Sequence, residues 1–202
     1  MKKTKRLSIY TIGHSTRTIA ELIQLLKEHD IQEIVDVRSI PRSRHNPQFN
    51  EKTVARSLQK NGLRYTHIKE LGGLRHTSKG SKNLGWRNSS FRGFADYMST
   101  PDFAKGLEFL EKIARKERTA IMCAEAVPWR CHRSMIADAL VKHHWNVLDI
   151  VNIKTASKHR LTPFLKVRHG KLTYPIPRPQ IRKLPKMEVT EIGSIGHENR
   201  KA

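Results

Sequence analysis

The stretch from Thr119 to Ala139 most constrains the fold of this chain, because it passes from a strand pattern to a helix pattern. It opens with the apolar run Thr119–Cys123 (TAIMC), which is typical of a buried strand. It closes with apolar residues at helical spacing from Ile136 onward. In an open α/β sheet, ligands bind at the loop that leaves the carboxyl end of a strand, and the next helix offers free N–H groups there. We therefore expect the functional site between this strand and this helix.

The chain before residue 152 repeats this alternation of strand and helix signals. Helices are indicated after a capping box at Thr18–Glu21, after Asn50, over 91–98 and after Thr100-Pro101. Strands are indicated over 7–12, 33–37, 63–68 and 146–151. The first strand, helix and strand predict a βαβ unit with parallel pairing and a right-handed crossover. We therefore expect an α/β core domain over residues 1–152.

The composition changes after residue 152. The segment 155–186 contains nine Lys or Arg residues, no Asp or Glu, and five prolines. A hairpin about His169-Gly170 fits residues 164–174. We expect the rest of 153–202 to form a basic, Pro-rich C-terminal arm, with a flexible tail over the last fifteen residues.

The net charge of +21 and the pI near 10.4 indicate an anionic partner, either nucleic acid or a nucleotide. No apolar run approaches the roughly 18 residues of a membrane span, so we expect no membrane partner. The two cysteines lie eight residues apart and make no disulfide framework, which favours a reducing, cytoplasmic setting. The sequence identifies neither a cofactor nor an oligomeric state.

Several short motifs occur in one order: TIGHS at 11–15, DVR at 36–38, PRSR at 41–44, YTH at 65–67, LGG at 71–73, FADYM at 94–98, CAE at 123–125 and CHR at 131–133. In these motifs the chain resembles the bacterial and archaeal family catalogued as domain of unknown function 488. The resemblance implies a three-layer α/β/α sandwich around a mostly parallel sheet, and it implies no particular activity. A weaker similarity is to rhodanese-like domains, whose second strand also often ends in Asp-Val-Arg. The gap from Cys123 to Arg130 is one residue longer than the related phosphatase spacing.

The strand ends carry the candidate site residues. If the first, second and fourth strands are neighbours, their loops bring ionisable groups from remote segments together. The candidates for acid, base or nucleophile are Glu125, Cys131, His14 and Asp36. Those for binding substrate phosphate are Ser15, Arg38, Arg44, His67, Arg130, His132 and Arg133. We expect Gly13 to permit a sharp turn, and Glu125 to pair with Arg38, Arg130 or Arg133 unless it acts as an acid or base.

Each thiol also has a structural interpretation. Cys131, at a helix start among cations, favours the thiolate, but it fits equally well as a small buried residue that packs the turn. Cys123 lies in an apolar strand and fits an inert hydrophobe. The spacing Cys-x7-Cys-His is not that of a zinc finger, and there is no CxxC, so we expect no bound metal. No phosphate-binding loop or dinucleotide fingerprint is present.

The long polar loop after Leu71 and the C-terminal arm interleave cations with a few aromatic residues. Such segments contact phosphates and stack on bases. The candidates for nucleic-acid contact are Arg75, Lys79, Lys82, Trp86, Arg87, Lys166, Arg168 and Lys171.

Three functions are compatible with these sequence features. The leading hypothesis is an enzyme acting on an anionic nucleotide or nucleic-acid substrate at Cys123–Arg133. The others are a non-catalytic nucleic-acid-binding protein and a thiol-based redox or metal sensor.

Overall fold

Six strands form one sheet within residues 7–177, the part of the chain that this computed structural model describes. They are β1 (Ser8–Gly13), β2 (Glu33–Asp36), β3 (Arg64–His67), β4 (Thr119–Cys123), β5 (Asn146–Ile150) and β6 (Ala156–Lys158). The strand order is β3-β2-β4-β1-β5-β6. All neighbours are parallel except β5 and β6. The predicted α/β class with a mostly parallel sheet is therefore confirmed.

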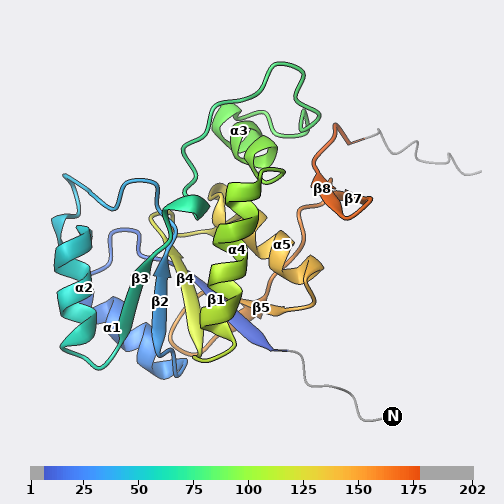
Figure 1. The fold of residues 1–202 in the computed structure, drawn as a ribbon. Coiled ribbons are helices and arrows are strands. Elements are labelled where there is room, and N and C mark those ends of the chain that lie inside the picture. The colour runs from blue at the N-terminus through green and yellow to red at the C-terminus, as the bar shows by residue number, and fades with distance from the viewer. Residues whose placement is uncertain (1–6, 178–202) are drawn as a thin grey trace, which may run out of the picture.

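Five helices accompany this sheet, and the helix at Ser89–Tyr97 lies beyond the ends of the strands (Figure 1). They are α1 (Ile19–Glu28), α2 (Glu51–Gln59), α3 (Ser89–Tyr97), α4 (Pro101–Ala114) and α5 (Arg133–Lys142). The capping box of α1 forms as expected, with the Glu21 amide donating to Thr18 Oγ1 and the Thr18 amide donating to a Glu21 carboxylate oxygen. Thr100 caps α4 in front of Pro101. Short 3-10 turns, η1 (Pro47–Phe49), η2 (Lys69–Leu71) and η3 (Pro128–Arg130), lie in the connecting loops.

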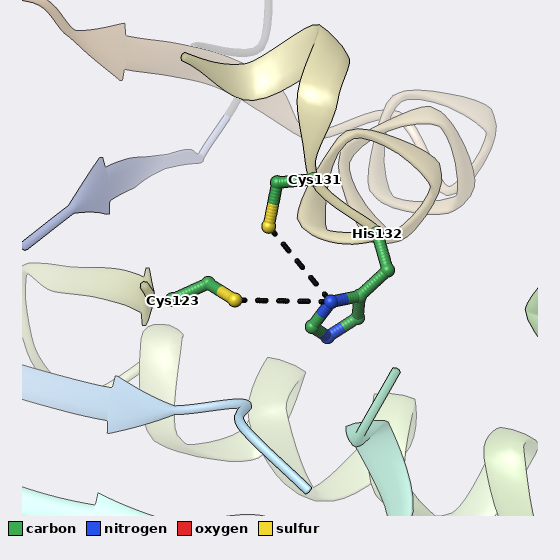
Figure 2. A group of neighbouring side chains, drawn as sticks. All are labelled: Cys123, Cys131 and His132. Atoms are coloured by element: carbon green, nitrogen blue, oxygen red, sulfur yellow. Dashed lines mark hydrogen bonds between the residues drawn. The ribbon is translucent and has the colours of Figure 1, made fainter. Parts of the chain in front are cut away.

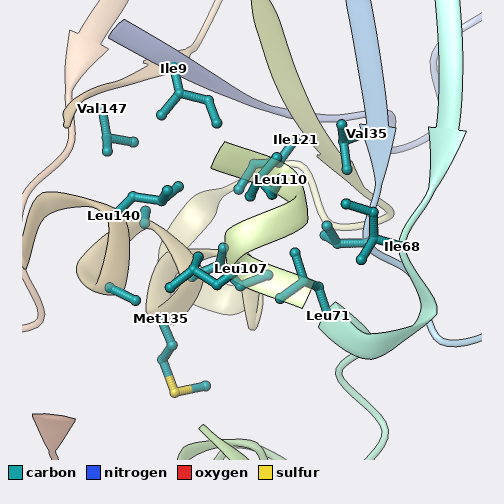
Figure 3. Packing of buried hydrophobic residues seen from close by; sticks show 14 of the residues in the cluster. Ile9, Val35, Ile68, Leu71, Leu107, Leu110, Ile121, Met135, Leu140 and Val147 are labelled. Carbon is teal, nitrogen blue, oxygen red and sulfur yellow. The ribbon is translucent and has the colours of Figure 1, made fainter. Parts of the chain in front are cut away.

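Each face of the sheet has its own apolar core, which makes the fold a three-layer sandwich. Under α1 and α2, Leu22, Leu26, Val54 and Leu58 pack with Ile34 and its neighbours on the sheet. On the other face, residues of α4 and α5 pack against alternate strand residues, as Figure 3 shows for Ile9, Val35, Ile121, Leu107, Leu110 and Leu140. Strands buried on both faces must be apolar throughout, which accounts for the uninterrupted run in β4.

The expected direct pairing of the first two strands is wrong, because β4 lies between β1 and β2. Ala120 of β4 is in register with both Tyr10 of β1 and Ile34 of β2. Local sequence identifies parallel strands but not their order, which depends on how the whole sheet assembles. The expectation that the first, second and fourth strands are neighbours is confirmed. Their carboxyl ends therefore lie side by side at one edge.

Residues 153–177 pack on the core, where the sequence suggested an extended arm. β6 adds an antiparallel strand, and β7 (Lys166–Arg168) and β8 (Lys171–Thr173) form the predicted hairpin about His169-Gly170. His159 is buried between the carboxylates of Asp138 and Asp149, and the Tyr174 hydroxyl donates to Asp138. The arm beyond residue 177 and the predicted flexible tail lie outside the described residues. Within 7–177, no helix has the length and apolar character needed to cross a bilayer.

Candidate functional site

A pocket of about 550 Å³ opens where the carboxyl ends of β1, β2 and β4 meet. Its walls are the loops after these three strands and the segments around Gly73 and Ser90. Seven of the residues predicted for the site line it: His14, Ser15, Arg38, Glu125, Arg130, Cys131 and His132. The fold thus brings together three segments that are remote in the sequence. This is the position at which open α/β sheets bind ligands.

Two thiols and an imidazole converge on one point of this pocket (Figure 2). Cys123 ends β4, while Cys131 and His132 immediately precede α5. The Sγ atoms of Cys123 and Cys131 each lie 3.8 Å from Nδ1 of His132. All three residues are buried. The turn η3 brings the chain back over the strand end, which is why residues nine positions apart meet.

The proton positions on His132 follow from its other nitrogen. Nε2 lies 2.9 Å from the carbonyl oxygen of Val37 and 3.1 Å from that of Leu71. Carbonyl oxygens only accept hydrogen bonds, so Nε2 carries the proton. In the neutral ring, Nδ1 is therefore the acceptor, and its lone pair points at the two sulfur atoms.

The two thiols perturb each other in opposite directions. The hydrogen bond with Cys131, together with burial, raises the pKa of the Cys123 thiol. Burial alone would raise the pKa of Cys131 as well, but the hydrogen bond with Cys123 and the charge of Arg133 act against burial, and that pKa is lowered. The two opposite shifts favour a thiolate on Cys131 beside a protonated Cys123.

His14, Arg38 and Asp36 form a buried set beside the pocket. Burial lowers the pKa of His14 to about 4, and its ring stacks on Phe49 with centroids 4.0 Å apart. The neutral ring donates from Nδ1 to the Ser15 carbonyl and accepts from Arg38 at Nε2. The Arg38 guanidinium binds the Asp36 carboxylate, with Nε 2.9 Å from Oδ1. Asp36 is fully buried and does not line the pocket, so it acts by holding Arg38.

Arg133 supports the loop and does not line the pocket. Only 1% of the residue is exposed, and its guanidinium donates to the backbone carbonyls of Glu125 and Ala126. Gly13 lies against the same segment, since a Cβ there would sit 1.8 Å from the Glu125 carbonyl oxygen. The sequence assigned Gly13 to a sharp turn, but Ser15 is the residue with a positive φ, of 50°. Gly13 is needed for the close approach of the loop.

Glu125 carries an exposed carboxylate at the pocket wall. The sequence offered Arg38, Arg130 or Arg133 as its partner. Within residues 7–177, its side chain makes no ion pair, because Arg38 binds Asp36 and Arg133 binds backbone carbonyls. The carboxylate is thus available to a ligand.

Besides Arg133, two more of the predicted phosphate ligands lie off the pocket, and one pocket arginine was not among the predicted residues. Arg44 is exposed on the loop after β2 but does not line the pocket. His67 binds the Arg38 carbonyl, with Nε2 2.8 Å from the oxygen. Arg42 lines the pocket instead, with Ser43 and Asn46. The basic loop was visible in the sequence, but which of its arginines turns inward depends on the path of the backbone.

The predicted nucleic-acid contacts divide into packed and exposed residues. Trp86 packs among Phe91, Phe164 and Tyr174, and the Arg75 guanidinium stacks 3.8 Å from the Tyr97 ring centroid, so neither is free to stack on bases. The exposed cations are Lys79, Lys82, Arg87, Lys166, Arg168 and Lys171. The Gly85 amide donates to the Tyr174 carbonyl at 2.9 Å, which joins the long loop to the hairpin.

Comparison with known proteins identifies one family. The family model for the domain of unknown function DUF488 matches residues 18–140, which include β4, the start of α5 and most of the pocket wall. The weaker similarity to rhodanese-like domains is not shown by this match. Neither the curated proteins nor the solved structures gave a significant match.

Proposed function

This chain belongs to the domain of unknown function DUF488 family, and we propose that it is an enzyme acting on an anionic substrate, with a nucleotide or nucleic-acid phosphate as the group held. One observation carries the proposal. The strand-end pocket combines cationic walls with a cluster of reactive side chains. Its volume of about 550 Å³ lies in the range of small-molecule sites.

The cationic wall supports an anionic ligand. Arg42 and Arg130 are exposed, line the pocket and form no ion pair within residues 7–177. Arg38 differs, because Asp36 already balances its charge. The hydroxyls of Ser15 and Ser43 add neutral donors to the same wall. A phosphate bound between Arg42 and Arg130 would gain charge-assisted hydrogen bonds without breaking an existing pair.

Side chains that could react with such a ligand line the same pocket as these two arginines. Cys131 with its neighbours Cys123 and His132 supplies the nucleophilic centre, and the free Glu125 carboxylate can accept or donate a proton at the rim. His14 is neutral and held by Arg38 and Ser15, which suits a positioning role more than proton transfer.

Calorimetric titration with inorganic phosphate and with nucleoside mono- and diphosphates tests the binding step. We expect R42A and R130A to weaken the ligand that binds by about tenfold or more, the loss of a charged hydrogen bond. R44A changes the neighbouring arginine that the sequence favoured but that lies off the pocket, and it should keep the affinity. Equal losses in R42A and R44A, or no binding by the wild type, would refute the assignment.

Turnover tests the catalytic step. Any ligand found in this way is incubated with the protein and its products are separated by chromatography. We expect E125Q to keep the affinity and lose most of the turnover. A ligand that binds and is never converted would reduce the protein to a binding module.

A second candidate is nucleic-acid binding by the basic loop and hairpin, with the core as a scaffold. The observation that favours it is the pair of hydrogen bonds that joins these segments, from Gly85 to Tyr174 and from Tyr174 to Asn83. The exposed cations of both segments thus belong to one connected part of the molecule. The triple change of Lys166, Arg168 and Lys171 to Ala tests this.

If those three side chains contact phosphates, the triple variant should reduce the slope of log affinity against log salt on duplex DNA by about 2.7. Fluorescence anisotropy at two salt concentrations measures the slope. R42A and R130A should leave it unchanged, since both arginines lie at the pocket. An unchanged slope in the triple variant would exclude the hairpin from the contact.

A further inference from the structure

We propose that Cys123, Cys131 and His132 form a three-ligand site for a soft divalent cation, with Zn²⁺ the ion their chemistry favours. The spacing in the sequence argued against a metal, because no compact ligand motif is present. The fold supplies the convergence that the sequence lacks. The metal site rests on the positions of the three donor atoms, while the role of its open position rests on the proposed function.

The donor atoms have the spacing that a tetrahedral ion requires. Zn–S bonds of about 2.3 Å and Zn–N bonds of about 2.05 Å at tetrahedral angles place sulfur and nitrogen about 3.6 Å apart. Both sulfur atoms lie 3.8 Å from His132 Nδ1, and all three donors lie within 4.8 Å of one another. Each sulfur–nitrogen distance is about 0.2 Å longer than this value, so a small movement of the side chains would bring these atoms to the separation of zinc ligands.

The imidazole is already oriented as a metal ligand. The two carbonyls of Val37 and Leu71 hold the proton on Nε2, which leaves the Nδ1 lone pair directed at the sulfur atoms. Ligand histidines in proteins almost always donate their other N–H to a carbonyl, a carboxylate or water in this way. Phe94 packs edge-on against the ring with centroids 4.9 Å apart, and Gly73 lies close to the Cγ and Nδ1 atoms of the ring, so the ring has little freedom to turn.

Without a cation, the cluster is poorly satisfied. One Nδ1 lone pair accepts one good hydrogen bond, yet both sulfur atoms lie 3.8 Å from it, and a thiolate on Cys131 has no proton to donate to it. A cation coordinated by both sulfurs and the nitrogen satisfies all three donors. Two thiolates also balance a divalent charge, so the complete cluster is neutral beside the buried Arg133. Thiolate and imidazole ligands select zinc over the hard ions magnesium and calcium.

Three protein ligands leave a fourth position, and all three residues line the pocket. Structural zinc sites are closed by four protein ligands, whereas catalytic sites keep one position for water or substrate. The Cys₂His set with an open position resembles the catalytic sites. If the proposed function holds, Cys131 would serve in the metal-bound site as a ligand and not as the nucleophile, and a zinc ion there would polarise a substrate oxygen held by Arg42 and Arg130.

Cobalt titration of the full-length protein tests the site. The protein is stripped of metal under anaerobic conditions with a phosphine reductant, and Co²⁺ is added as the only probe. We expect one equivalent to bind, with intense tetrahedral d–d bands and a thiolate-to-cobalt charge-transfer band. Zinc should displace the cobalt, and bound metal should protect both cysteines from alkylation.

Ligand variants give the matched comparison. C131S and H132Q should weaken cobalt binding by at least about 100-fold, more than the loss of an outer-shell partner. H45Q changes an exposed histidine that lies outside the pocket lining, and it should bind as the wild type does. Circular dichroism of each metal-free variant establishes that it is folded. If C131S does not fold, the cobalt spectrum of the wild type and the alkylation rates of its cysteines still show whether the thiolates bind the metal.

Three outcomes would overturn the proposal: no cobalt uptake by the folded, reduced wild type, uptake without a thiolate charge-transfer band, or full affinity in H132Q. A Cys123–Cys131 disulfide formed in air, with no metal uptake after reduction, would also overturn it and assign the pair to redox chemistry. Metal binding is measured without substrate. Cobalt uptake with no phosphate ligand would therefore refute only the proposed function.

Discussion

Three contacts fix a single imidazole at the centre of the site. Two carbonyls hold His132 Nε2, and the ring lies so close to Gly73 that a Cβ there would sit 2.5 Å from it. Gly73, the second glycine of the Leu-Gly-Gly segment, therefore cannot carry a side chain without displacing the histidine ring. The orientation of one ring determines whether both sulfurs and a nitrogen face the same point.

The G73A variant tests this dependence. The added methyl group must push the His132 ring or the loop, so we expect cobalt affinity to fall by about 10- to 100-fold, as for the loss of an outer-shell contact. G85A is the matched control, because its Cβ would meet Pro175 and Phe164 at 2.5 and 2.6 Å, outside the site. We expect G85A to lower the melting temperature and to keep the cobalt affinity. Equal effects on metal binding would contradict a specific role for Gly73.

For single residues, the sequence indicated which side chains belong to the site but not which way they point. Cys131, His132, Glu125 and Arg130, which the sequence suggested as site residues, all line the pocket. The directions of side chains could not be predicted. Arg42 faces the pocket and Arg44 does not, while Trp86 packs inside an aromatic cluster. Such choices depend on the backbone path of loops and on contacts with distant segments, which have no periodic signal.

The connection from β4 to α5 is the element that assembles the site, and a buried guanidinium holds it. Arg133 binds the carbonyls of Glu125 and Ala126 from inside, while Gly13 admits the loop against β1. The amide of His14 donates to the Cys123 carbonyl and that of Ser15 to the Ala124 carbonyl, at 2.9 and 2.8 Å. The loop is thus bound to its neighbour along its first residues.

Replacing Arg133 should loosen this loop. R133Q removes the guanidinium that binds the Glu125 and Ala126 carbonyls, and we expect a loss of about 1–3 kcal/mol in the free energy of unfolding by urea. Affinity for a pocket ligand should fall with it, because Glu125 and Arg130 lose their placement. R130Q is the comparison, since it removes an exposed guanidinium and should weaken an anionic ligand with little change in stability. A stable R133Q with a normal pocket would show that the guanidinium does not hold the loop.

Helices and strands were mostly predictable, and their arrangement was predictable only in part. The capping box at Thr18, the Thr100-Pro101 start and the apolar run of β4 are local signals, and each has the expected structure. The insertion of β4 between β1 and β2 has no local signal. The docking of residues 153–177 was missed because it depends on the burial of His159 and Tyr174 against α5 and β5.

For the whole molecule, two buried histidines with opposite shifts limit the pH range of stability. Burial holds the pKa of His14 near 4, below its ordinary 6.5, with Arg38 and Arg133 acting in the same direction and Asp36 against them. Its stabilising effect is present above pH 6.5 and is lost as the pH falls toward 4, because the unfolded chain takes up the proton first. We expect the free energy of unfolding to fall over this window, and H14Q to flatten that fall. If the free energy of unfolding of H14Q falls equally steeply, other titrating groups cause the loss of stability at acid pH.

His159 determines how the stability falls at alkaline pH. Burial opposes its charge, but hydrogen bonds to Asp138 and Asp149 outweigh that effect and raise its pKa to about 9. The raised pKa stabilises the fold fully below pH 6.5, and this contribution, up to about 3 kcal/mol, disappears as the pH rises through 9. Urea unfolding between pH 6 and 10 should show this decline in the wild type. In H159Q the curve should be lower and nearly flat, whereas H143Q changes a surface histidine paired with Glu111 and should retain the wild-type decline. A wild-type curve without the decline would mean that His159 is neutral and that the docking of residues 153–177 does not depend on its charge.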